Sequence, residues 1–364
     1  MKHILSSSQL FWLLVSFMTG SSLLMAPDLT AFYAKQDGWV SMLIAIGIGL
    51  VLNVIWIYLL SKYHYQSIFI IVEKVAGKWV GRAISLILVF YALHLCAYVV
   101  RNLSNFMNSN VLPNTNVWIF QIMLLCVALY STFSGLNNLS RVNEFLNPIM
   151  ALLFFGSLLL TLNRFQWHYF KPAFEMPVRK MMQGAYTTTG FPFIEIIIFS
   201  SLFTFVTHKG KIMKRYLLAI VISGLVLTMT IIIVIGCDGA FMVSRMSYPT
   251  YELMRTINLF KILERIEILI AVVWIVGIFV KVTICLFTAF FGLQHVAQHE
   301  NFHPFILPAG ILVWSLSNHI HGNMMQFTEF VARNWTLWWF SMYALLTVIM
   351  TVGIFLKKHT TSTE

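Results

Sequence analysis

Long apolar stretches alternate with short polar connections along nearly the whole chain. Ten of them have about the length that an α-helix needs to cross the hydrocarbon core of a bilayer, which is roughly 20 residues. The pattern therefore predicts an all-α polytopic membrane protein with ten transmembrane helices. The stretches lie at residues 10–32, 38–61, 83–107, 117–132, 145–162, 186–207, 216–236, 268–292, 305–320 and 335–356.

Two of these stretches, the first and the sixth, carry an interruption of small and hydroxyl-bearing residues. Residues 19–22 read TGSS, and residues 187–192 read TTTGFP, in which Pro192 has no backbone N–H to donate. Glycine tolerates unusual backbone angles, and hydroxyl groups satisfy backbone groups that are freed where a helix unwinds. We therefore predict that the first and sixth helices are broken and form a transporter-type binding site near the middle of the bilayer. Two lipid-facing helices with ordinary glycines are the alternative.

The predicted helices divide into two sets of five, which is the count expected for a transporter built from two inverted repeats. The first repeat would span about residues 10–162 and the second about 186–356. A linker at 163–185 that contains two prolines would join them. The whole chain, 1–364, would thus form a single transmembrane domain.

The connection between the seventh and eighth predicted helices, at 237–267, is unusually long. After Pro249, apolar residues recur at helical spacing with charged residues between them. This spacing predicts a short amphipathic helix on the membrane surface. A docking surface or a gate over the pocket is the functional alternative. The apolar residues are Leu253, Ile257, Phe260 and Leu263.

Composition supports a membrane protein and changes how the net charge is interpreted. Of the 364 residues, 59% are hydrophobic and only 10% are charged, whereas soluble domains have about 25% charged residues. The formal net charge of +11 lies mostly in the connections, where Lys and Arg set topology and contact lipid headgroups, so we expect no nucleic-acid partner. The dense basic cluster at 209–215 favours a cytoplasmic location for that connection and for both termini.

The cysteines, histidines and tryptophans give weaker indications of function. The four cysteines are far apart and lack metal-binding spacing, so buried free thiols are expected. His295 and His299 have H-x3-H spacing without an acidic ligand set, so no metal is predicted. Trp335, Trp338 and Trp339 fit an aromatic belt at the membrane interface. Walker, nucleophile-elbow and HExxH motifs are absent from the sequence, so we expect neither catalysis nor a cofactor.

Four segments of the chain look familiar. They are SSSQLFWLLVSFMTGSSLL at the start, QDGWVSMLIA after the first span, RVNEFLNP before the fifth, and SYPTYELMRTIN followed by LERIEILIAVVW before the eighth. Together they resemble the spore germination permease family, the GerAB-type B-subunits of nutrient germinant receptors. The stretch from Glu264 to Glu267, with Trp274, is the most specific part of the resemblance.

The resemblance covers nearly the whole chain and carries several implications. It implies a branch of the amino acid–polyamine–organocation superfamily, with the leucine-transporter-like fold of two inverted five-helix repeats. It also implies an integral subunit of the spore inner membrane that senses a nutrient, typically an amino acid. Such a subunit would work with an A-subunit membrane protein and a C-subunit lipoprotein.

A small amino-acid-like germinant would find a partner for each of its charges at the broken helices. Half-helix N-termini present N–H groups and a positive dipole end to the carboxylate, while unwound carbonyls accept from the ammonium group. We therefore expect the ligand to contact Gly20, Ser21, Ser22, Gly190 and Phe191. Stripes at helical spacing in the third and eighth spans complete the predicted pocket, although helix–helix packing is an alternative for both. The stripes consist of Tyr91, Leu95, Tyr98, Thr283 and Phe287.

Two ionisable residues lie inside predicted spans, Glu195 in the sixth and Lys281 in the eighth. A charge at the centre of a bilayer costs about 2.5–3.5 kcal/mol on insertion scales, so both residues are candidates for an ion or proton site. In related sodium-coupled carriers the eighth span helps to hold a cation beside the first span. The resemblance thus implies that Lys281 supplies the positive charge in place of sodium, with Glu195 as its partner or as a proton site. A purely structural ion pair, or hydrogen bonds to helix carbonyls, is the alternative for both.

Three functions share these features. The first is a ligand-gated receptor subunit that binds a germinant and signals to partner subunits, which requires different affinities for two conformations. The second is a proton-coupled amino acid permease in which the same site alternates its access. The third is an ion or water channel formed by the same helices. The pocket residues do not separate the first two, and the family resemblance favours the first.

Overall fold

The computed structural model describes residues 5–256 and 265–360, with side chains up to Leu356, and this part of the chain is nearly all helical. Among these residues, seven helical runs are long and apolar enough to cross a membrane. They are Ala26–Lys62, Lys78–Val111, Val117–Ser134, Leu136–Arg164, Lys209–Asp238, Glu267–Ala297 and Trp335–Leu356. A membrane protein with several spans is therefore confirmed. The count of ten stays a prediction, because the first, sixth and ninth predicted spans are interrupted or short.

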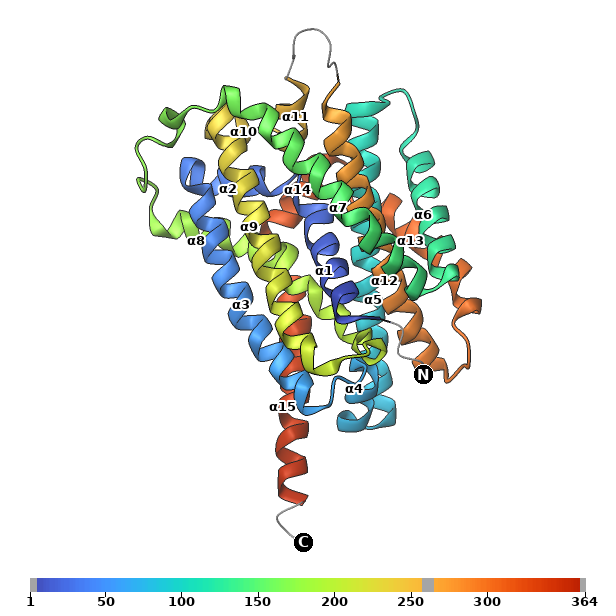
Figure 1. Cartoon of the computed structure of the whole chain (residues 1–364). Helices are drawn as coiled ribbons and strands as arrows, with labels where there is room; N and C mark the ends of the chain where they lie inside the picture. Colours follow the sequence, from blue (N-terminus) through green and yellow to red (C-terminus); the bar gives the residue numbers. More distant parts are fainter. Residues whose placement is uncertain (1–4, 257–264, 361–364) are drawn as a thin grey trace.

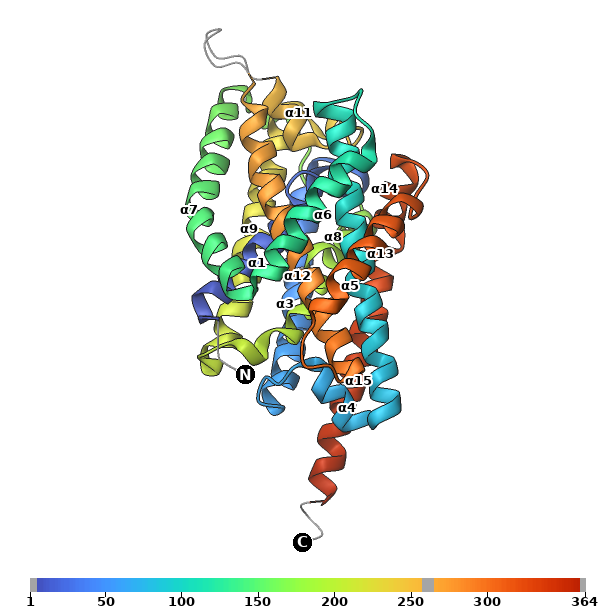
Figure 2. The same ribbon diagram turned by 90° about the vertical axis from the view of Figure 1, so that its right-hand side faces the viewer.

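Each predicted span corresponds to one helix or to a pair of shorter pieces (Figures 1 and 2). The elements in chain order are α1 (Ser7–Ser22) with α2 (Ala26–Ala34), α3 (Gly38–Lys62), α5 (Lys78–Phe106), α6 (Val117–Ser134), α7 (Leu136–Thr161), α8 (Val178–Thr188) with irregular turns to Ser201, α9 (Ile212–Asp238), α12 (Glu267–Ala297), α13 (Ile306–His319) and α15 (Trp335–Thr360). Three short helices that the sequence pattern did not predict are α4 (Ile68–Ala76), α10 (Ala240–Val243) and α14 (Met324–Arg333), and another short helix, α11 (Pro249–Arg255), lies in the connection where a helix was expected.

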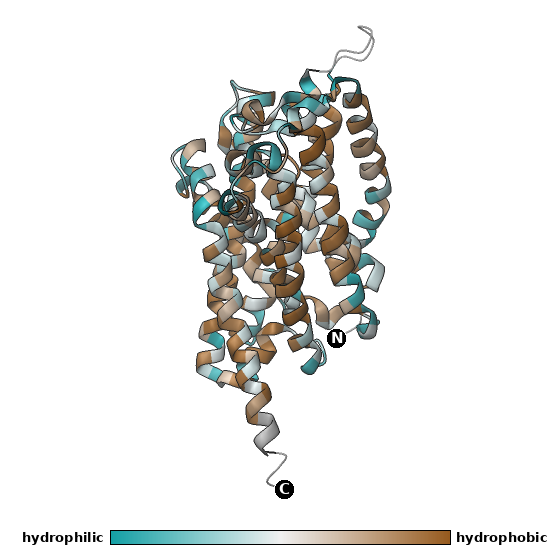
Figure 3. Ribbon diagram, turned by 90° about the vertical axis from the view of Figure 1, so that its left-hand side faces the viewer, coloured by the Kyte–Doolittle hydropathy of each residue, from teal (hydrophilic) through white to brown (hydrophobic). Residues whose placement is uncertain are grey.

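The helix α1 lies inside the bundle, where it packs against α12, α9 and α7 (Figure 1). Apolar residues dominate the middle of the bundle, and hydrophilic residues gather mainly in the connections at its ends (Figure 3). The beginning of α1 and the end of α15 lie toward the same end of the bundle (Figure 1). This arrangement agrees with an even number of crossings.

The first break lies a few residues later than the sequence pattern predicts. Residues 19–22 are still helical, and the chain turns at 23–25 before α2 begins. The cause is Pro27, which lacks the N–H that the Leu23 carbonyl would otherwise accept in a continuous helix. Thr250 of α11 replaces that donor, because its hydroxyl donates to the Leu23 carbonyl at 2.9 Å. A side chain from outside the bundle's long helices therefore satisfies the first break.

The second break lies where the TTTGFP segment predicts it. Phe191, directly before Pro192, has non-helical angles of φ −121° and ψ 99°, and a 3₁₀ turn follows over Glu195–Ser201. The Asn53 amide of α3 donates to the Phe193 carbonyl at 2.9 Å. At each break, a polar side chain from another helix thus donates a hydrogen bond to a backbone carbonyl group.

Replacing Thr250 by valine keeps the shape of the side chain and removes the donor to Leu23. The Leu23 carbonyl is buried, so we expect a loss of about 1–3 kcal/mol of unfolding free energy. Thermal unfolding of the purified protein measures the change. The control is Thr132→Val, because the buried Thr132 hydroxyl donates only to the Ala128 carbonyl of its own helix. Equal thermal stability of both variants would contradict the role of Thr250.

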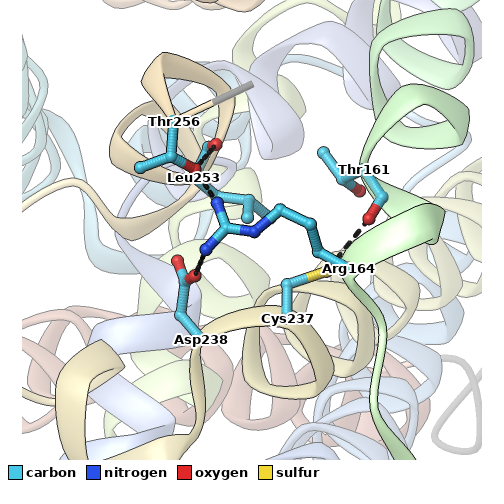
Figure 4. A network of polar contacts seen from close by, with 6 residues as sticks. All are labelled: Thr161, Arg164, Cys237, Asp238, Leu253 and Thr256. Carbon is cyan, nitrogen blue, oxygen red and sulfur yellow. Dashed lines mark hydrogen bonds and ion pairs between the residues drawn. The ribbon is translucent and has the colours of Figure 1, made fainter. Parts of the chain in front are cut away.

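The connection 237–267 is anchored to the bundle by a polar network at the end of α7 (Figure 4). Arg164 pairs with Asp238 at 3.3 Å and donates to the Thr256 hydroxyl, which itself donates to the Leu253 carbonyl at 2.7 Å. Beside it, the Cys237 thiol contacts the Thr161 carbonyl at 3.4 Å. The network holds α11 in place and with it the Thr250 hydroxyl.

A short helix, α11, begins at Pro249 and ends at Arg255, and its Leu253 and Met254 are buried in the bundle. The helix therefore packs into the protein over its described length. It contains one of the four predicted apolar positions, so the amphipathic helix on the membrane surface stays a prediction. Three of the predicted apolar positions, Ile257, Phe260 and Leu263, lie outside the described residues.

Candidate functional site

A fully buried ion pair joins the two broken helices at the centre of the bundle. Lys281 of α12 donates to one carboxylate oxygen of Glu195 and, at 2.6 Å, to the hydroxyl of Ser21 near the end of α1. The other Glu195 oxygen accepts from the indole N–H of Trp335 in α15 at 2.5 Å. Lys281 and Glu195 are both 0% exposed. Four elements that are far apart in the sequence thus meet at one charge pair.

Aromatic rings enclose the Lys281 ammonium group on its other sides. Its nitrogen lies 4.6 Å from the centroid of Phe17 and 5.1 Å from that of Phe191, within the range of cation–π attraction. The predicted partnership of Lys281 with Glu195 is therefore present in the structure. Whether the pair acts as an ion or proton site stays a prediction.

A narrow cavity of about 20 Å³ adjoins this ion pair, which is room for about one water molecule. Four of the residues predicted to contact the ligand line this cavity, and they come from α1, α5 and the second break. These are Ser21, Leu95, Tyr98 and Phe191. Six further residues complete the lining of this central cavity. These are Met25, Val99, Asn102, Phe327, Val331 and Trp335.

The two predicted glycines lie at helix crossings. A Cβ atom on Gly277 of α12 would lie 2.5 Å from the Gly20 Cα atom, so α1 and α12 can approach this closely only because both residues are glycine. A Cβ atom on Gly190 would lie 2.5 Å from the Thr336 Cα atom of α15. Close packing therefore accounts for both glycines, and neither adjoins the central cavity; a contact with ligand stays a prediction.

Four other predicted contacts also lie outside the lining of the central cavity. Tyr91 stacks on Trp338, with 4.4 Å between ring centroids. Thr283 donates to the Phe279 carbonyl of its own helix at 2.8 Å, and Phe287 stacks on Phe291. The buried Ser22 hydroxyl has no hydrogen-bond partner among the described residues. Packing between helices, the alternative given for these positions, explains where Tyr91, Thr283 and Phe287 lie.

The sequence pattern missed the residues that close the central cavity. Trp335 and Trp339 are 2% and 0% exposed, so the prediction that they belong to an interfacial aromatic belt is wrong for both. Phe327 and Val331 come from α14, a short polar helix without a hydropathy signal. The sequence did contain one signal. Glu195 is an ionisable residue inside an apolar span, so a buried hydrogen-bond donor such as the Trp335 indole could be expected near it.

Two hydrogen bonds close the central cavity. Tyr98 bonds to His321, just before α14. The Tyr248 hydroxyl donates to the Asn102 amide oxygen at 3.0 Å. Beyond Tyr248 lies a second, polar cavity of about 620 Å³, lined among others by Arg101 and Arg245. Movement of α14 or of the segment that carries Tyr248 would therefore change the walls of the central cavity.

Helices that break beside a buried charge in the middle of an apolar bundle are typical of the folds of membrane transporters. A solved structure supports this class at the level of the fold. That structure is of Mhp1, a nucleobase-cation-symport-1 family transporter, which was solved in a closed conformation with bromovinylhydantoin bound. This chain is similar to it with a TM-score of 0.61 and 12% sequence identity. The match covers 91% of this chain and 75% of Mhp1.

The chain belongs to the spore germination permease family, since the family model described as "Spore germination protein" matches residues 4–327. Spore germination protein KB of Bacillus subtilis (strain 168) is 25% identical over 328 residues, which is 89% of this chain and 87% of that protein. Spore germination protein YndE of the same organism is 27% identical, over 81% of this chain and 82% of its own. Spore germination protein B2, also from B. subtilis, is 25% identical over 83% and 81%. The resemblance predicted from the motifs is confirmed.

Proposed function

We propose that this chain is the B-subunit of a nutrient germinant receptor. It binds a small amino-acid-like germinant in the central cavity and signals to an A-subunit and a C-subunit lipoprotein in the spore inner membrane, with both termini in the cytoplasm. It does so without catalysis or a cofactor. The observation that carries the proposal is the buried network of Lys281, Glu195, Ser21 and Trp335, which links both broken helices beside the central cavity.

The chemistry of the network suits a zwitterion. An ammonium group has three donors, and Lys281 uses two of them on Glu195 and Ser21. No described residue accepts a hydrogen bond from the third, and a ligand carboxylate would reach it in a conformation in which Phe191 moves aside. Leu95, Phe191 and Val331 offer an apolar wall for a modest side chain.

The size of the central cavity implies how binding becomes a signal. About 20 Å³ is too small for any amino acid, so the described conformation is closed and a ligand must select or create a wider one. In our proposal, the cavity widens when α14, or the connection that carries Tyr248, moves and breaks its hydrogen bond to α5. A ligand with different affinities for the two conformations shifts their populations, and partner subunits sense the shift.

Leu95→Phe is expected to raise the nutrient concentration for half-maximal germination at least tenfold. Leu95 is fully buried in the cavity wall, and a larger ring there removes the space that a ligand needs. The measurement is a dose–response curve of spores that carry the variant, with protein level determined by immunoblot. The matched control is Leu86→Phe, an exposed position on the same helix, which is expected to respond normally. A normal response of Leu95→Phe at normal protein level would contradict the pocket.

A proton-coupled amino acid permease is the second candidate, and Glu195 favours it. A buried carboxylate within a membrane span, paired with a lysine, is a suitable proton carrier. Uptake of labelled amino acid into proteoliposomes that contain only this chain would support the permease. Lost germination in pocket variants, with no uptake by the wild type, would support the receptor.

A further inference from the structure

Asp28, in the first turn of α2, is a buried acidic residue that the central site does not use. The residue is 8% exposed, and no described residue hydrogen-bonds or pairs with its carboxylate. An uncompensated buried carboxylate is strongly unfavourable, and buried polar groups in proteins almost always have partners. Its retention inside a membrane protein therefore calls for a partner that comes from outside the chain.

The carboxylate lines a cavity of about 260 Å³ between α2 and α14, separate from the central cavity. Leu29, Phe32 and Met325 form apolar walls. Two charged residues also line the cavity, Glu329 and Arg333, but they pair with each other at 2.9 Å and are exposed. Because these two charges compensate one another, Asp28 is the acidic group of this cavity that has no partner among the described residues.

The lining selects among cations. Calcium and magnesium take six or more oxygen ligands. Glu329 already pairs with Arg333, so Asp28 is the one carboxylate of the lining without a partner among the described residues, which is too few for either ion. An organic ammonium group fits better, because it needs one strong acceptor while its carbon chain covers the walls. The rings of Phe32 and Tyr33, which also line the cavity, add a surface that attracts cations. We propose that this cavity binds the ammonium group of a small apolar amine or amino acid on Asp28.

The site lies on the opposite side of the helix that closes the central cavity. From α14, Phe327 and Val331 point to the central cavity, whereas Met325, Thr328 and Ala332 line the Asp28 cavity. A ligand on Asp28 therefore contacts the same helix that lines the central cavity. This second site goes beyond the proposed function and does not depend on it.

The test is titration calorimetry on the purified full-length chain in nanodiscs, with 3-methylbutylamine as the probe. Binding of the amine, and no binding of 3-methylbutanoate, is expected. Asp28→Asn should weaken amine binding about tenfold to a hundredfold, as expected for the loss of one charge-assisted hydrogen bond. The matched control is Glu300→Gln, which removes an acid from the exposed connection after α12. No amine binding to the wild type, or equal affinity in Asp28→Asn, would overturn the proposal.

Two further arms complete the experiment. Leucine, titrated in the Leu95→Phe background so that the central cavity does not contribute, identifies the source of the ammonium group. Binding of leucine that Asp28→Asn abolishes assigns the site to amino acids, and binding of the amine alone assigns it to simple amines. If Asp28→Asn does not fold, Thr328→Phe fills the same cavity from α14 and is expected to abolish amine binding. Unchanged binding in Thr328→Phe would place the amine elsewhere and overturn the proposal.

Discussion

Lys281→Met is expected to remove most of the folded protein from the membrane and to abolish the germination response. The substitution leaves the Glu195 carboxyl group, 0% exposed, with the Trp335 indole as its remaining partner among the described residues. Removing one member of a buried pair costs about 3–5 kcal/mol, which is a large part of the stability of a typical protein. The measurements are the protein level in spore membranes and the melting temperature of the purified chain.

The double variant Lys281→Met with Glu195→Gln separates stability from function. Both charges are then absent, so folding should recover toward the wild-type level, because an ion pair replaced as a whole is often nearly neutral. The germination response should stay absent, because no ammonium group remains for the ligand carboxylate. Recovery of both folding and response in the double variant would show that the pair is only structural. A normal level and response in Lys281→Met alone would contradict any role.

Gly20→Ala is expected to destabilise the protein by several kcal/mol through the crossing of α1 and α12. A Cβ atom on Gly20 would clash with the backbone carbonyl group of Gly277, and backbone atoms cannot move aside as the end of a flexible side chain can. Overpacking of this kind costs about 1–3 kcal/mol and occasionally more, and backbone contact places this case at the upper end. Gly277→Ala should have a similar effect. Thermal unfolding and membrane level are the measurements.

Gly156→Ala is the matched control for the helix crossing. A Cβ atom on Gly156 of α7 would meet nothing within 4 Å, so this substitution should be neutral or slightly stabilising. Wild-type stability of Gly20→Ala would show that α1 and α12 are farther apart than the structure places them. A loss of germination in Gly20→Ala therefore reports on helix packing first and on the ligand only if the protein level is normal.

The apolar spans and the second break follow from the sequence because their causes are local. Hydropathy marks a span directly, and Pro192 removes a donor within the segment that breaks. The first break was placed too early for a related reason. Pro27 acts on the carbonyl of Leu23, four residues before it, whereas the TGSS residues that drew attention remain helical.

The arrangement around the central cavity was less predictable because it depends on long-range partners. Glu195 and Lys281 could be singled out as charges within apolar spans, but their common partners, Ser21 and Trp335, come from the two ends of the chain. Gly20 and Gly190 looked like hinge or ligand positions, and only the opposing Gly277 and Thr336 reveal close packing. A tryptophan at the start of a span is typical of an aromatic belt, and its burial is visible only once α14 and α5 are placed around it.

The most direct test of the central claim is photo-crosslinking of a diazirine-bearing amino acid that triggers germination, followed by mapping of the labelled peptides in the intact receptor. The account predicts labelling on α5 at Leu95, Tyr98 or Val99, residues that line the central cavity, with the label displaced by an excess of the natural nutrient. Specific labelling confined to a partner subunit, or to other parts of this chain, would contradict the claim that the broken helices hold the germinant.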